Sequence, residues 1–212
     1  MYPLVVSDLS IDQLLEAIER VTGMPLVRVP TDQGSVGRNA GSPLLAGEVG
    51  GHSYLVDLGA ALLASMQSHL SKIALECECL IVASSFDRTE SQCEFFAVQG
   101  DEVLRLFWHN AIKTTKDYSS GSQLDSEVDA PLSTPDGSGL TAALRSFGFH
   151  QMDYTKGFQR APGDFVVTWA GDALECLSHD SLAQQINNHV RNHPNPDYRA
   201  PVPRVTIRPM DK

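Results

Sequence analysis

Basic residues are scarce in this chain of 212 residues, which has 16 lysines and arginines against 26 aspartates and glutamates and a net charge of −10. A protein this acidic repels the phosphates of nucleic acids and the anionic headgroups of membranes. We therefore expect no nucleic-acid partner and no membrane partner. The acidity fits either plain solubility, which is the more common reason for such a charge, or a basic protein partner.

Long apolar runs are missing as well. The most apolar stretch, residues 54–66, is interrupted by Asp57 and is too short to cross a bilayer. The first eight residues contain no basic region and no long apolar run, so we expect no signal peptide. The four cysteines include no Cys-x-x-Cys pair, and unpaired thiols are typical of a reducing compartment. A cytoplasmic location is the resulting expectation.

Motifs for catalysis, cofactors and metals are also lacking. The glycine-rich residues 34–41 are not followed by the Gly-Lys-Ser/Thr of a phosphate-binding loop. Residues 51–55 lack the final glycine that the sharp turn of a serine-hydrolase nucleophile requires. His189 and His193 are four residues apart, but no glutamate follows His189, and both are read as surface residues. We expect no catalytic residue, no cofactor and no metal site.

The composition indicates a single folded unit. Hydrophobic residues make up 42% of the chain and charged residues 20%, which are ordinary values for a globular protein. We expect one α+β domain over residues 1–193. Residues 194–212 contain several prolines and scattered basic residues, and we expect them to form an extended C-terminal tail.

Local patterns predict the helices and strands. Ser10 and Gln13 form a capping box, apolar residues follow at helical spacing, and Gly23 ends this helix. Strands at 79–86, 93–98 and 103–108 are separated by connections that are too short for parallel neighbours. We therefore predict an α+β fold in which an antiparallel sheet, a meander, is packed with helices on one face. Further expectations are helices at 60–75 and 140–147, a last helix ending near 191, strands at 26–29, 52–58 and 165–169, and loops at 30–51 and 113–139.

The third strand of the meander alternates in polarity. Leu106 and Trp108 lie on one side of it, and Arg105 lies on the other. We expect the side of Leu106 and Trp108 to face the core.

Negative charge is concentrated in the middle of the chain. Residues 76–136 contain twelve acidic and four basic residues, whereas residues 191–212 have more basic than acidic residues. The alternatives are a solvated surface and an acidic face that binds a basic partner. Loops and turns carry the candidates for partner binding, which are Asp87 and Glu90 in the first hairpin turn, Asp101 and Glu102 in the second, and Asp125, Glu127 and Asp129 in the loop at 113–139. We expect the loop and the first turn to act together.

Residues 58–110 resemble the cores of small bacterial immunity proteins. The resemblance lies in the order helix, buried strand, Asp-Arg-Thr-Glu-Ser turn at 87–91, strand, Gly-Asp turn at 100–101, and strand ending Leu-Arg-Leu-Phe-Trp at 104–108. Immunity proteins bind the toxin domains of polymorphic and interbacterial secretion systems. The resemblance implies a cytoplasmic, non-enzymatic, acidic protein that occludes the active site of a cognate toxin. We expect the toxin domain to have a basic cleft, because toxins that act on nucleic acids or nucleotides bind phosphates.

Two other classes of function stay open on the sequence. One is an enzyme whose site is assembled from loops and leaves no motif. The other is a structural or adaptor subunit.

Overall fold

The computed structural model describes residues 3–29, 44–57, 67–89, 92–110, 117–159 and 162–169. Several expectations fall outside these ranges, namely Glu90, His189, His193, the last helix, the tail at 194–212 and the domain end at 193.

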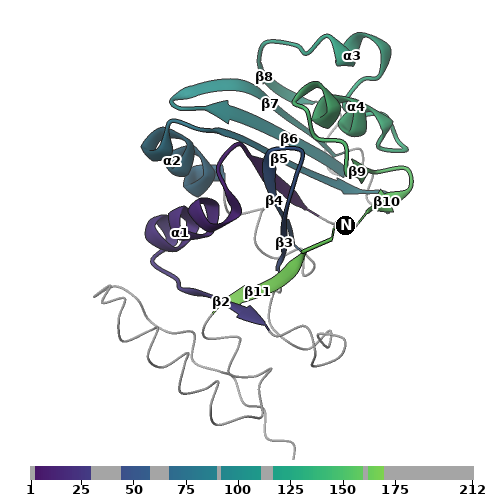
Figure 1. Cartoon of the computed structure of the whole chain (residues 1–212). Helices are drawn as coiled ribbons and strands as arrows, with labels where there is room; N and C mark the ends of the chain where they lie inside the picture. Colours follow the sequence, from purple (N-terminus) through teal and green to yellow (C-terminus); the bar gives the residue numbers. More distant parts are fainter. Residues whose placement is uncertain are drawn as a thin grey trace, which may run out of the picture.

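A nine-stranded antiparallel sheet forms the centre of the fold (Figure 1), in the order β2-β11-β3-β4-β1-β5-β6-β7-β8. Its strands are β1 (Leu4–Ser7), β2 (Leu26–Val29), β3 (Leu44–Val49), β4 (His52–Asp57), β5 (Leu80–Asp87), β6 (Gln92–Gln99), β7 (Glu102–Asn110), β8 (Tyr118–Gly121) and β11 (Phe165–Trp169). A separate two-stranded sheet pairs β9 (Met152–Asp153) with β10 (Gly157–Phe158). The predicted α+β class with an antiparallel sheet is confirmed.

The meander of β5, β6 and β7 is present as predicted, with Phe96 opposite both Ala83 and Leu106. Three other strands of this sheet were not anticipated, nor were β9 and β10 of the small sheet. β3 and β8 lie in segments that were expected to be loops, and β1 lies between β4 and β5 in the middle of the sheet. β1 depends on pairing with distant parts of the chain, which short-range patterns do not report. β3 and β8 also pair with their neighbours in sequence, β4 and β7, but each lies in a polar segment rich in glycine and serine.

The first helical layer contains α1 (Ile11–Thr22) and α2 (Gln67–Cys77). The capping box of Ser10 and Gln13 is formed, and Gly23 ends α1 in the left-handed conformation with φ of 68°, which glycine adopts without steric cost. Leu14, Ile18 and other apolar residues of α1 share a buried cluster with Leu70 and Ile73 of α2. These two helices cover one face of the sheet, as expected.

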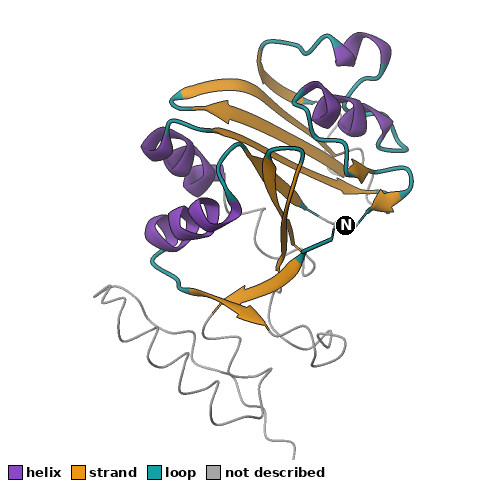
Figure 2. Ribbon diagram, viewed as in Figure 1, coloured by secondary structure: helices purple, strands orange, loops and turns teal. Residues whose placement is uncertain are grey.

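A second helical layer lies on the opposite face (Figure 2). It contains α3 (Ser126–Asp129) and α4 (Ser138–Ser146). Its helix α4 matches the helix predicted at 140–147, but the cover of a second face was not anticipated. The consecutive residues Phe95 and Phe96 point to opposite faces of β6, and both are buried, being only 1% and 5% exposed. A sheet with apolar side chains on both faces needs cover on both. α4 provides part of that cover, because Leu140 and Leu144 share a buried cluster with Phe95.

The predicted burial along β7 is wrong, although Leu106 does pack in part against the cluster of α1 and α2. Arg105 and Phe107 are buried, at 4% and 7% exposure, whereas Leu106 and Trp108 are only half-buried. The alternation is present as predicted, but the side that carries Arg105 is the more deeply buried one. A buried arginine is stable only when its charge is compensated, and a carboxylate that is distant in sequence provides that compensation.

Candidate partner-binding surface

Arg105 of β7 holds the segment that follows β8 against the sheet. Its Nε donates a hydrogen bond to Oε1 of Glu127, and its Nη2 donates one to Oε2, both at 2.7 Å. Both side chains of this bidentate pair are almost completely buried, at 5% and 6% exposure. The remaining nitrogen, Nη1, donates to Oγ of Ser119 at 2.6 Å and to the carbonyl of Ser120 at 3.2 Å. One guanidinium therefore connects β7, β8 and α3.

Hydrogen bonds of the backbone extend this anchor. The amide of Ser122 donates to the carbonyl of Leu104 at 3.1 Å, and the amide of Leu124 donates to Oε1 of Glu127 at 3.1 Å. Residues 124–130, which we call the acidic corner, are thus fixed at both the backbone and the side-chain level. A fixed loop loses less conformational entropy when a partner binds.

The acidic corner presents charge and apolar surface together. Asp125 and Asp129 are exposed, and Val128 between them is 76% exposed. The ion pairs of the described residues involve neither aspartate. Uncompensated charges beside an exposed apolar side chain are suited to contact a basic protein surface.

Glu127 is a correction to the predicted set of partner-binding residues. Its carboxylate points inward to Arg105 and is not available to a partner. The sequence offered no local sign of this, because the two residues are 22 positions apart. Asp125 and Asp129 stay in the set.

The first hairpin turn lies away from the anchor of the acidic corner. Asp87 is half-buried at the end of β5 and accepts a hydrogen bond from the amide of Thr89 at 2.8 Å. Asp87 is the cross-strand partner of Gln92 on β6, and Gln92 is in turn the partner of Asn110 on β7. Arg105 is five residues before Asn110, or about 17 Å along the strand. The anchor and the first turn are therefore not brought together as expected.

The surface at the first turn also carries a positive charge, so it differs in charge from the acidic corner. Arg88 is exposed, and its charge acts on the carboxyl of Asp136. Hydrogen bonds from Ser138 hold the pKa of Asp136 below its usual value, and Arg88 adds a smaller effect in the same direction. This part of the surface is of mixed charge.

The second hairpin turn collects more acidic residues than the sequence suggested. Asp101 and Glu102 are exposed there, and the amide of the adjoining Gly100 donates to the carbonyl of Cys79. This contact brings the exposed Glu78 to the same end of the sheet. Glu102 is three residues from Arg105, or about 10 Å along β7, so the anchor of the acidic corner lies nearer to this turn than to the first.

The enzyme alternative has one geometric candidate in the described chain. Cys93 and His109 are cross-strand partners, and Nδ1 of His109 is 2.5 Å from Oδ1 of Asp117. A nucleophilic cysteine requires a lowered pKa. Burial, with smaller contributions from the charges of Asp117 and Glu94, instead raises the pKa of the Cys93 thiol to about 12. This thiol is therefore a poor nucleophile.

None of the helices in the described ranges is long and apolar enough to cross a bilayer. The same residues contain no group of three or more His, Cys, Asp or Glu side chains placed to hold a metal ion. Comparison of the chain with protein-family models, with curated proteins and with solved structures found no match.

Proposed function

We propose that this protein binds and neutralises a partner protein with a basic surface, as an immunity protein blocks its toxin. The observation that carries the proposal is the acidic corner, in which exposed Asp125 and Asp129 flank Val128 on a segment fixed by the buried pair of Arg105 and Glu127. Toxin domains that act on nucleic acids have basic clefts, because their substrates carry phosphates. In this proposal the protein acts in the cytoplasm.

The acidic corner contributes to binding in two ways. Asp125 and Asp129 attract the basic surface at long range, which raises the rate of association. Val128 is removed from water on contact, which slows dissociation. The buried pair of Arg105 and Glu127 positions all three side chains without touching the partner.

Affinity capture from the native cell tests this assignment. The tagged wild-type chain is compared as bait with the double variant Asp125→Lys/Asp129→Lys. We expect capture of the partner to fall about tenfold or more, because close charge pairs across an interface couple by about 1.5 kcal/mol or more. The control is Glu16→Lys/Glu76→Lys, which changes the net charge by the same amount on the exposed sides of α1 and α2, in the helical layer on the other face of the sheet.

Equal losses in the two double variants would show that only overall charge matters, and unchanged capture in both would contradict the proposed surface. Growth provides the arm that separates inhibition from a mere adaptor role. The captured partner expressed alone should arrest growth, and co-expression of the wild-type chain should restore it. The Asp125→Lys/Asp129→Lys variant should fail to do so while remaining folded by circular dichroism.

A further inference from the structure

The nine-stranded sheet ends at β8, one of its two edge strands. In the part of the chain that the structure describes, β8 pairs with β7 alone, and all four of its residues are exposed. Its sequence, Tyr-Ser-Ser-Gly, contains neither the lysine nor the proline that commonly blocks the edge of a sheet. The outer edge of β8 is therefore open to an additional strand.

The backbone of β8 presents hydrogen-bonding groups on this open edge. The amide of Ser122 donates to the carbonyl of Leu104 on β7 at 3.1 Å. The carbonyl of Gly121, on the other side of the same trans peptide, therefore points outward. Amides alternate in direction along a paired strand, which places those of Ser119 and Gly121 on the open edge as well. These are the groups that a further antiparallel or parallel neighbour binds.

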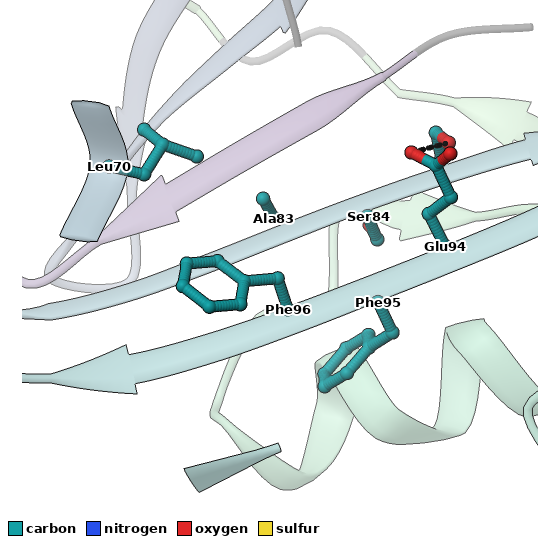
Figure 3. A pocket seen from close by; sticks show the side chains of 7 residues that line it. Leu70, Ala83, Ser84, Glu94, Phe95 and Phe96 are labelled. Atoms are coloured by element: carbon teal, nitrogen blue, oxygen red, sulfur yellow. Dashed lines mark hydrogen bonds between the residues drawn. The ribbon is translucent and has the colours of Figure 1, made fainter. Parts of the chain in front are cut away.

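The two faces of β8 continue the two faces of the sheet. Phe95 and Phe96 point to opposite sides of β6 (Figure 3), and they belong to the buried clusters of α4 and of α2, respectively. Their rows of cross-strand partners, through β7, end in Ser119 and Ser120 of β8. Ser119 therefore lies on the α4 side, and Ser120 lies on the α2 side with Tyr118, two residues before it. A strand added to β8 has one face on each side.

The surroundings of β8 differ between these two sides. On the α4 side, Oγ of Ser119 and Oε1 of Glu127 accept hydrogen bonds from the same buried guanidinium of β7, at 2.6 and 2.7 Å, which holds α3 beside β8. The exposed Asp125 and Asp129 of the acidic corner thus offer negative charge on this side. On the α2 side, Tyr118 is 58% exposed and offers an aromatic ring.

We infer that the basic partner adds a strand to β8, and that this strand alternates basic with apolar side chains. Its backbone binds the open edge, its basic side chains lie toward Asp125 and Asp129, and its apolar side chains contact Tyr118. Strand addition of this kind takes its affinity from the main chain and its specificity from alternate side chains. The inference rests on the proposed function, because the added strand belongs to the same partner.

Synthetic peptides test the open edge by ¹H–¹⁵N NMR titration of the full chain. The probe is acetyl-Lys-Val-Lys-Val-Lys-Val-Lys-amide, and its match is acetyl-Lys-Lys-Val-Val-Val-Lys-Lys-amide, which has the same composition without the alternation. A third peptide is the probe with N-methyl groups on its three central residues, which keeps every charge but removes backbone donors. We expect the probe to shift the amides of Ser119 and Gly121 and to protect them from exchange. Both other peptides should bind about tenfold more weakly, the ratio for loss of one or two net hydrogen bonds.

Matched variants separate strand addition from general attraction to an acidic protein. Tyr118→Ser removes the ring on the α2 side and should weaken binding of the probe about fivefold. Leu75→Ser removes an apolar side chain of similar exposure, 56%, from α2 and should leave binding unchanged. Equal binding of the three peptides, or shifts centred away from β8, would overturn the inference.

The free protein provides a further check on what covers this edge. Protection of the amides of Ser119 and Gly121 without any peptide would overturn the inference. Protection that rises with protein concentration would identify a second copy of the chain on β8, and protection independent of concentration would identify another segment of the same chain.

Capture from the native cell distinguishes failure of this inference from failure of the proposed function. If Asp125→Lys/Asp129→Lys loses the partner, but Ser119 and Gly121 are unprotected in the wild-type complex, the proposed function stands and the added strand is refuted. If the probe binds β8 while capture is independent of the acidic corner, the edge accepts a strand and the proposed function fails.

Discussion

Glu127→Ala should destabilise the protein by about 3–5 kcal/mol, the usual cost of removing one partner of a buried ion pair. The variant leaves Nε and Nη2 of Arg105 without their acceptors, while Nη1 keeps Ser119. Both side chains of the pair are at least nine-tenths buried, so water does not readily replace the lost carboxylate. Chemical denaturation in urea measures the cost, and Asp129→Ala, which removes an exposed acid from the same helix, should change stability by less than about 0.5 kcal/mol.

A double-mutant cycle separates the pair from the cost of burying either side chain. Arg105→Met/Glu127→Leu replaces both charges by apolar groups and should be more stable than either single variant, because no charge is left unpaired in the interior. Hydrogen exchange should meanwhile show loss of protection over residues 119–130 in Glu127→Ala. A cost below about 1 kcal/mol for Glu127→Ala would place the pair among ordinary surface ion pairs. That result would refute the view that Arg105 fixes the acidic corner.

Two further predictions concern the core. Phe107→Ala should lower the free energy of unfolding by about 3–5 kcal/mol in a urea titration. Leu106→Ala should lower it by less, because the Leu106 side chain is only half-buried. A larger loss for Leu106→Ala would show that the side of β7 with Leu106 and Trp108 is the more deeply buried one, as the sequence predicted. Burial raises the pKa of the Tyr154 phenol, whose Oη lies 2.9 Å from Oγ of Ser84. Its contribution to stability is complete below about pH 10 and is lost as the pH rises further, because the unfolded state releases the proton first. Tyr154→Phe should flatten this alkaline loss, and an unchanged slope would contradict the assignment.

The acidic surface was only partly predictable from the sequence. Asp125 and Asp129 are exposed as expected, because a polar segment between strands normally lies at the surface. Glu127 belongs to the same run of acids but is buried, and only its contact with Arg105 explains why. β8, which lies beside this surface, was expected to be part of a loop, because the serines and glycine at 119–121 are typical of turns.

Local patterns in the sequence determined the features that depend on neighbouring residues. The capping box of Ser10 and Gln13 and the left-handed Gly23 set the bounds of α1, since both act within one turn of helix. The short connections between β5, β6 and β7 determined their antiparallel pairing, because no crossover fits into so few residues.

Tertiary structure alone decided the features that depend on distant partners. β1 pairs with both β4 and β5, which places the start of the chain in the middle of the sheet. The buried side of β7 carries Arg105 because Glu127, 22 residues further on, neutralises it. A charge is stable in the interior only with such a partner, and the pattern of a single strand does not contain that partner.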